Sequence, residues 1–210
     1  MVRGRRDYAA SSPAARALVL LRACRPRQWA KNVLVFAAPA AAGRLDQPHV
    51  ALEAAGAFVV LCLVSSATYL VNDVRDREQD RLHPTKRRRP IAAGELSVAA
   101  ALRAAAVLVV AGIGLAFAIT PGLAAVAVGY MAVTSTYSLW WRHVVVLDIL
   151  AIAAGFALRA LAGGVATDIY LSRWFVLVTA FGAIYLVAAK RLAEQREHTG
   201  KGPSPASSGA

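Results

Sequence analysis

Residues 50–71 read VALEAAGAFVVLCLVSSATYLV, and residues 72–94, which follow directly, read NDVRDREQDRLHPTKRRRPIAAG. The first run is apolar over the length of about 20 residues that a helix needs to cross a bilayer. The second run is densely charged, and its helical part ends before Pro84, because the residue before a proline disfavours helical backbone. Together the two runs predict a membrane-spanning helix that emerges at a charged surface.

The composition of the whole chain agrees with a membrane protein. Of its 210 residues, 58% are hydrophobic and only 17% are charged. These values exclude a disordered chain, a secreted disulfide scaffold and a cytosolic enzyme with an ordinary core. Cys24 and Cys62 form no CxxC pair, so neither a disulfide framework nor a zinc site is indicated.

Six apolar runs are candidates for membrane-spanning helices. They lie at residues 29–42, 50–71, 98–119, 121–141, 144–165 and 172–189. The first run is short and contains Pro39, whereas the later runs are better delimited by turn residues. We therefore expect an all-α fold, a multi-pass transmembrane helical bundle of about six spans.

The two ends of the chain differ from the bundle. Residues 1–28 are basic and predict a short interfacial helix at 14–24, with leucines toward lipid and arginines toward headgroups. The apolar run 17–21 is followed by arginines and lacks a cleavage site, so it does not fit a signal peptide. The bundle is expected over 29–195, and a disordered Gly/Ser/Pro-rich tail over 196–210.

Basic residues indicate the orientation of the bundle. The chain has 24 Lys and Arg against 12 Asp and Glu, a net charge of +12. With six spans and a cytoplasmic N-terminus, the two densest basic segments, before residue 33 and at 71–95, both fall on the cytoplasmic side. The opposite side receives only Arg44 and Arg173. We expect a plasma-membrane protein whose N-terminus is cytoplasmic.

Carboxylates follow the apolar run at helical spacing. Asp73, Asp76 and Asp80 stand at i, i+3 and i+7, which places them within about 60° on one helix face. The polar stripe continues back into the apolar run through Ser65, Tyr69 and Asn72. The pattern predicts a carboxylate face that enters the membrane as a polar stripe toward the bundle interior.

This face has the chemistry of a magnesium and diphosphate site. The first and last carboxylates are about 10 Å apart along a helix axis, too far for one ion to hold all three. Mg²⁺ binds through one or two carboxylates plus substrate phosphates, and the four cations at 86–89 would neutralise a leaving diphosphate from the other side. The alternative is a solvated turn with internal salt bridges, beside cations that only set topology.

Charged residues also occur in or beside the later spans. Asp148 and Arg159 are about 16 Å apart along a helix axis and cannot pair with each other. Asp148 lies near Tyr137 and Arg142 and is a candidate for the polar site, whereas Arg159 lies deeper and has either a structural role or a ligand contact. Lys190, at the end of the last run, is either a ligand residue or a snorkelling basic end.

Three motifs resemble a known family. They are RPRQWAKN at 25–32, the NDxxDxxxD pattern at 72–80 and HPTKRRRPIAAG at 83–94. With them the chain resembles the UbiA superfamily of intramembrane transferases and, within it, the branch of decaprenyl-phosphate phosphoribosyltransferases. Further stretches that fit this branch are LRALAGGVAT, SRWF and AKRLAE, so the resemblance covers about residues 16–195.

The resemblance implies a helical bundle whose cytoplasmic mouth binds a diphosphate through Mg²⁺. Its catalytic and metal-binding residues would be Asp73, Asp76 and Asp80. The substrate-binding residues would be Lys31, Asn32, Asn72, His83, Lys86, Arg87, Arg89, Tyr137, Arg142, Asp148 and Lys190, with Lys31 and Asn32 at the rim.

The reaction of this branch follows from its two substrates. A phosphate oxygen of decaprenyl (polyprenyl) phosphate attacks the anomeric carbon of phosphoribosyl diphosphate, and diphosphate leaves. The lipid product is a precursor of cell-wall arabinan, and no covalent enzyme intermediate is needed.

Two alternatives remain open. One is a UbiA-type prenyltransferase that uses a prenyl diphosphate and an aromatic acceptor, although its second DxxxD motif is not found in YSLWWRHVVVLD at 137–148. The family has about nine membrane helices, so the chain is expected to be C-terminally shortened. The other alternative is therefore a membrane protein that is inactive or depends on a partner to complete its bundle.

Overall fold

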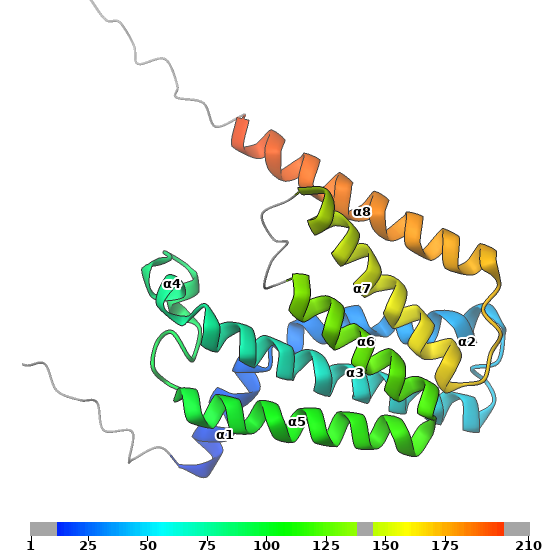
Figure 1. Ribbon diagram of the computed structural model, residues 1–210, viewed down its shortest axis with the longest axis horizontal. Helices are drawn as coiled ribbons and strands as arrows, with labels where there is room; N and C mark the ends of the chain where they lie inside the picture. Colours follow the sequence, from blue (N-terminus) through cyan, green and yellow to red (C-terminus); the bar gives the residue numbers. More distant parts are fainter. Residues whose placement is uncertain (1–11, 138–144, 200–210) are drawn as a thin grey trace, which may run out of the picture.

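The computed structural model describes the backbone of residues 12–137 and 145–199, without the side chains of 145–148, 190–191 and 194–199 (Figure 1). All regular structure in these ranges is helical, which confirms the all-α prediction. The elements are α1 (Pro13–Ala23), η2 (Pro26–Phe36), α2 (Ala37–Ala41), α3 (Pro48–Arg75), α4 (Arg77–Leu82), η3 (Lys86–Arg88), α5 (Val98–Ile119), α6 (Pro121–Thr136), α7 (Val145–Ala166) and α8 (Arg173–Thr199), where η marks a 3₁₀-helix.

Capping residues explain where two of the long helices begin. The Ser97 hydroxyl accepts a hydrogen bond from the Ala100 amide at the start of α5, at 3.2 Å. The Thr120 hydroxyl does the same for the Leu123 amide of α6, at 3.0 Å, and Pro121 occupies the first position of that helix. Each cap satisfies an amide that the first turn of a helix leaves unpaired, which stabilises the helix by about 1 kcal/mol.

Three helices are long and apolar enough to cross a membrane: α3, α5 and the Ile149–Ala166 part of α7. The apolar helices at Pro121–Thr136 and Arg173–Ala189 are shorter, so the expected count of about six spans is not confirmed.

The first expected span, 29–42, is not one α-helix. It folds as the 3₁₀-helix η2 followed by the five-residue α2. A 3₁₀-helix rises about 2.0 Å per residue against 1.5 Å in an α-helix, so residues 29–41 extend about 24 Å. That length is shorter than a hydrocarbon core of about 30 Å, and the segment is not among the helices long enough to cross a membrane.

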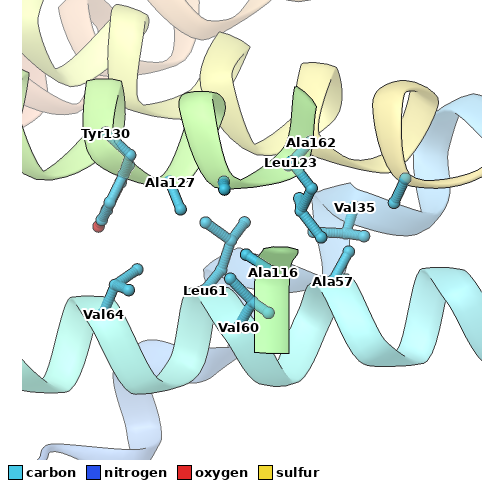
Figure 2. Close-up of a cluster of buried hydrophobic side chains, with 12 residues drawn as sticks. Val35, Ala57, Val60, Leu61, Val64, Ala116, Leu123, Ala127, Tyr130 and Ala162 are labelled. Carbon is cyan, nitrogen blue, oxygen red and sulfur yellow. The ribbon is translucent and has the colours of Figure 1, made fainter. Parts of the chain in front are cut away.

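The largest buried cluster joins α3 to α6 and α7 (Figure 2). Val60, Leu61 and Val64 of α3 pack with Leu123 and Ala127 of α6. Glycine allows a close approach nearby, because a Cβ atom on Gly163 of α7 would lie 1.8 Å from the backbone oxygen of Val35. The 3₁₀-helix η2 therefore lies directly against α7.

A second buried cluster holds α1 against the bundle. Cys24, which follows α1, belongs to one buried cluster with Leu70 of α3, with Ile91 in the loop before α5, and with Ala101 of α5. Cys24 lies outside the spanning helices, and burial raises the pKa of its thiol, while a hydrogen bond with Ser66 lowers it in part. α1 forms where an interfacial helix is expected, but its place in the interface stays a prediction.

Several chain ends meet at one end of the bundle. Figure 1 shows the end of α3, α4, the start of α5, the end of α6 and the start of α7 at this end. The charged segment after α3 therefore lies at the same end of the bundle as the end of α6 and the start of α7, as the six-span order predicts.

Candidate active site

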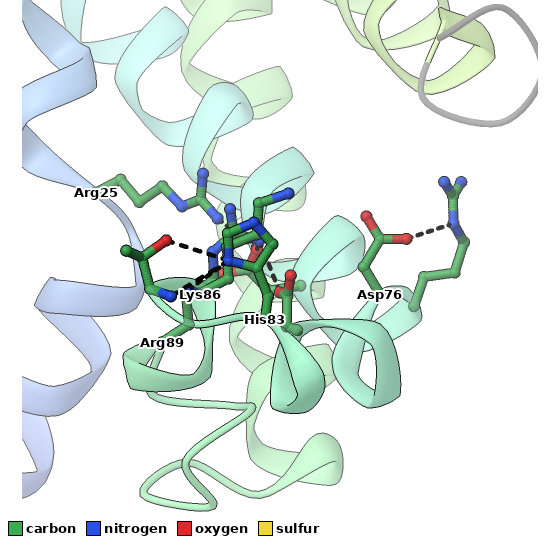
Figure 3. A network of polar contacts seen from close by, with 9 residues as sticks. Arg25, Asp76, His83, Lys86 and Arg89 are labelled. Carbon is green, nitrogen blue, oxygen red and sulfur yellow. Dashed lines mark hydrogen bonds and ion pairs between the residues drawn. The ribbon is translucent and has the colours of Figure 1, made fainter. Parts of the chain in front are cut away.

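Two buried carboxylates and two partly exposed arginines form a cluster where α3 ends (Figure 3). Nη1 of Arg89 lies 3.1 Å from Oδ1 of Asp73 and 2.7 Å from Oδ2 of Asp80. Nη2 of Arg25 also pairs with Oδ1 of Asp73. Asp73 and Asp80 are each 3% exposed, so the charges are neutralised by one another rather than by water.

Asp76 does not join this cluster, which corrects the prediction that the three aspartates share one face. The α-helix is interrupted at Asp76, which has ψ of 6° and separates α3 from α4. Its carboxylate is 22% exposed and pairs with Nε of Arg75 at 3.5 Å. Figure 3 shows Asp76 well apart from Arg25 and Arg89.

The donors that remain fit a magnesium ion. Within the described residues no three His, Cys, Asp or Glu side chains are grouped closely enough to hold a metal ion. Two carboxylates converge, however, and Mg²⁺ uses one or two carboxylates together with water and substrate phosphates. The hard oxygen donors of Asp73 and Asp80 therefore match this ion in type and number.

Arg25 is the residue of this cluster that the sequence reasoning missed. Its backbone has φ of 56°, a left-handed conformation that costs a non-glycine residue about 1–3 kcal/mol. Its guanidinium lies 5.1 Å from the centroid of the Tyr69 ring. The signal that could have identified Arg25 is its position in the motif RPRQWAKN, from which only Lys31 and Asn32 are predicted as site residues.

The polar stripe of α3 lines a cavity in the bundle interior. Ser65, Tyr69 and Asn72 face a space of about 240 Å³. The other polar residues that line it are Lys31, Thr68, Tyr130, Thr134, Tyr137 and Arg159. The helical spacing thus predicted correctly that these side chains turn inward, and Tyr137 lies among them.

Arg159 is held deep in this cavity wall by neutral oxygens. Nε donates to Oδ1 of Asn32 at 2.9 Å, Nη1 to the Gly155 carbonyl at 2.7 Å and Nη2 to the Tyr130 hydroxyl at 2.8 Å. The residue is 6% exposed, and its guanidinium also lies 4.9 Å from the Tyr130 ring centroid. Arg159 therefore links η2, α6 and α7. Of the two roles that the sequence left open, the structural one is thus present.

Asn32 is not at an exposed rim, contrary to the expectation. It is 1% exposed, and its Nδ2 donates to Sγ of Cys62 at 3.3 Å. The reason is that η2 turns this face of the chain onto α3 and α7, while Lys31, the next residue along, remains exposed.

His83 orders the basic loop after α4. Its Nδ1 lies 3.2 Å from the Thr85 amide and 3.4 Å from the Lys86 amide, both of which point their N–H groups at it. Lys86 and Arg87 are exposed beyond this turn. Arg142 and the side chains of Asp148 and Lys190 lie outside the described residues, so their assignments stay predictions.

Comparison with known proteins identifies the family. The profile of the UbiA prenyltransferase family matches residues 33–197. The chain belongs to this family. The membership confirms the resemblance drawn from the three sequence motifs.

Several UbiA-family relatives carry the same name. The chain is 51% identical to decaprenyl-phosphate phosphoribosyltransferase of Corynebacterium glutamicum over 83% of its own length and 54% of that protein. It is 49% identical to the protein of that name from Mycolicibacterium smegmatis, over 86% of its own length and 59% of that protein. It is 48% identical to the one from Mycobacterium tuberculosis, over 90% of its own length and 64% of that protein. The chain thus spans between about half and two thirds of the length of these relatives.

Solved structures of the family have the same fold. A UbiA homolog from Archaeoglobus fulgidus bound to GPP and Mg²⁺ has a TM-score of 0.67 and 21% identity, over 85% of this chain and 64% of that one. A digeranylgeranylglyceryl phosphate synthase has a TM-score of 0.65 and 18% identity, over 80% of this chain and 58% of that one. At these identities the likeness concerns the fold alone.

Proposed function

We propose that the chain transfers the 5-phosphoribosyl group from phosphoribosyl diphosphate to decaprenyl (polyprenyl) phosphate and releases diphosphate. The observation that carries this proposal is the convergence of Asp73 and Asp80 with two arginines beside a polar cavity in a membrane bundle. The naming of relatives that are 48–51% identical supports the choice of substrates.

Asp73 and Asp80 are the residues that would hold Mg²⁺, which when bound neutralises charge on the leaving diphosphate. Arg25 and Arg89 pair with these carboxylates in the structure. When the diphosphate binds, the two guanidinium groups exchange carboxylate oxygens for phosphate oxygens, which they bind through strong charge-assisted hydrogen bonds. Asn72 lies next to Asp73 on the cavity wall and orients the bound group.

The acceptor lipid is proposed to lie in an apolar groove of about 700 Å³ between η2, α2 and α8. Lys31 and Phe156 line both this groove and the polar cavity. A lipid phosphate beside Lys31 would place its chain along Leu34, Phe36 and Val178. Its deprotonated oxygen then forms the bond to the anomeric carbon as the bond from that carbon to diphosphate breaks.

A prenyltransferase reaction with a prenyl diphosphate and an aromatic acceptor is the second candidate. The binding of GPP and Mg²⁺ by the Archaeoglobus fulgidus homolog of similar fold favours it. Both candidates use the same diphosphate site, so they differ in the group attached to the diphosphate. In either case we propose a plasma-membrane location with a cytoplasmic N-terminus and, for the leading candidate, a place in cell-wall synthesis.

Membranes that contain the 210-residue chain test the proposal. With Mg²⁺, labelled phosphoribosyl diphosphate and polyprenyl phosphate, we expect a labelled product that extracts into chloroform. An excess of a prenyl diphosphate should inhibit the formation of this product only weakly. The control variant Asp46→Asn, on the opposite side of the expected bundle, should form the product at an unchanged rate. Absence of product from the chain would contradict the proposal and favour an inactive or partner-dependent membrane protein.

A further inference from the structure

A strongly basic cavity lies beside the aspartate cluster. It has a volume of about 640 Å³ and is formed between the chain after α1 and the loop after α4. Its charged lining consists of Arg22, Arg25, Arg27, Lys86, Arg88 and Arg89. No carboxylate is part of its lining within the described residues.

Three of these six cations are already neutralised. Arg22 pairs with Glu95 at 3.0 Å, and Arg25 and Arg89 pair with the two buried aspartates. The side chains of the other three, Arg27, Lys86 and Arg88, form no ion pair or hydrogen bond with another described residue. The cavity thus presents three positive charges without a described counter-charge to one space, an arrangement that attracts an anion.

We propose that this basic cavity binds the 5-phosphate of the phosphoribosyl donor, while the diphosphate of the same molecule binds at Asp73 and Asp80. This inference rests on the proposed function. A phosphate monoester carries about −1.5 to −2 charges at pH 7, which is the kind of anion that three uncompensated cations attract. Arginine also binds phosphate through two parallel hydrogen bonds, so Arg27 and Arg88 suit this ligand in shape as well as charge.

The position of Arg25 and Arg89 supports a single ligand that reaches both places. Their side chains line the basic cavity and also contact Asp73, so they form the wall between the two sites. The loop that carries Lys86 and Arg88 is ordered in advance by the hydrogen bonds to His83, which lowers the entropic cost of binding.

The basic cavity would select between donor classes. A prenyl diphosphate carries no phosphate group besides its diphosphate, so it leaves the three cations of the basic cavity without a counter-charge. Phosphoribosyl diphosphate satisfies both sites. Specificity then comes from contacts that only one of the two donors makes.

The test measures binding rather than turnover. The purified chain in phosphatidylcholine nanodiscs is titrated with phosphoribosyl diphosphate, inorganic diphosphate and ribose 5-phosphate in the presence of Mg²⁺. For the double variant Arg27→Gln, Arg88→Gln we expect affinity for phosphoribosyl diphosphate to fall about tenfold or more. Affinity for inorganic diphosphate should stay within about twofold, and ribose 5-phosphate should bind the unchanged chain only.

Arg103→Gln is the matched control, because Arg103 is an exposed arginine of α5 outside the cavity. It should bind all three probes like the unchanged chain. Equal losses for phosphoribosyl diphosphate and inorganic diphosphate in the double variant, or no loss for either, would overturn the assignment of the cavity. An unchanged chain that binds inorganic diphosphate but neither phosphoribosyl diphosphate nor ribose 5-phosphate would instead overturn the proposed function.

A lipid headgroup also carries a phosphate that the basic cavity could bind. Varying the lipid composition of the nanodiscs distinguishes this source from the donor. Ribose 5-phosphate should bind the unchanged chain equally in phosphatidylcholine nanodiscs and in nanodiscs that contain anionic phosphatidylglycerol. A loss of ribose 5-phosphate binding that occurs only with phosphatidylglycerol would assign the basic cavity to lipid headgroups and overturn the inference.

Discussion

Two clusters in this protein hold arginine in different ways. At the end of α3, Arg25 and Arg89 pair with the carboxylates of Asp73 and Asp80. In the bundle interior, Arg159 is held by a side-chain amide, a backbone carbonyl and a phenol. The first cluster is electrically balanced and built from charges, whereas the second keeps an unbalanced positive charge among neutral partners.

This difference determines which cluster can exchange its partners for a bound ligand. An ion pair of opposite charges can open without leaving an unpaired charge when a metal ion takes the carboxylates and phosphate takes the guanidinium groups. Arg159 has no such replacement, because its neutral partners would each lose a buried hydrogen bond. We therefore expect the aspartate cluster to determine activity and the Arg159 cluster to determine stability.

Removal of magnesium should separate the two clusters most strongly. With EDTA we expect product formation to be abolished, because the leaving diphosphate loses its counter-ion. The thermal unfolding midpoint of the chain in detergent should not change, since the arginines neutralise Asp73 and Asp80 without metal. A large fall of the midpoint with EDTA, reversed by Mg²⁺, would show that the metal is structural and would contradict this comparison.

Asp73→Asn should lower the rate by about 100-fold to 1,000-fold, the usual cost of removing one group that stabilises a transition-state charge. The amide has nearly the same shape and cannot hold Mg²⁺ as a carboxylate does. The rate is measured by product formation at saturating substrates. Size-exclusion elution equal to that of the unchanged chain is the control for folding, and a rate within threefold of it would exclude Asp73 from the site.

Arg159→Met should instead destabilise the fold by about 1–3 kcal/mol, because Asn32 and Tyr130 lose a buried hydrogen-bond partner. For a chain of this size that corresponds to a lower midpoint by about 2–4 °C for each kcal/mol. Thermal unfolding in detergent measures it, with Arg103→Met as the exposed control. An unchanged midpoint together with lost substrate binding would make Arg159 a ligand residue and break the comparison.

The interior cavity was predictable from the sequence in a way that the two clusters were not. Ser65, Tyr69 and Asn72 lie on one continuous helix, so their spacing alone places them on one face. The same periodicity failed at Asp76, where the helix is interrupted. The contact of Arg159 with a residue 127 positions away depends on how η2 packs against α7, which no local pattern contains.

Asp76→Asn should have the smallest effect and gives the sharpest test of the corrected geometry. A three-aspartate metal site predicts that all three substitutions are comparably severe. In the structure Asp76 pairs with Arg75 near the surface, and such exposed ion pairs contribute about 0–1 kcal/mol. We therefore expect a rate within about fivefold of the unchanged chain, whereas Asp80→Asn should match Asp73→Asn, because Arg89 bridges these two carboxylates. The three variants are compared in one assay across a magnesium titration. A raised magnesium requirement for Asp76→Asn equal to that of Asp80→Asn would mean that substrate binding rotates Asp76 into the site and reforms the single helix face.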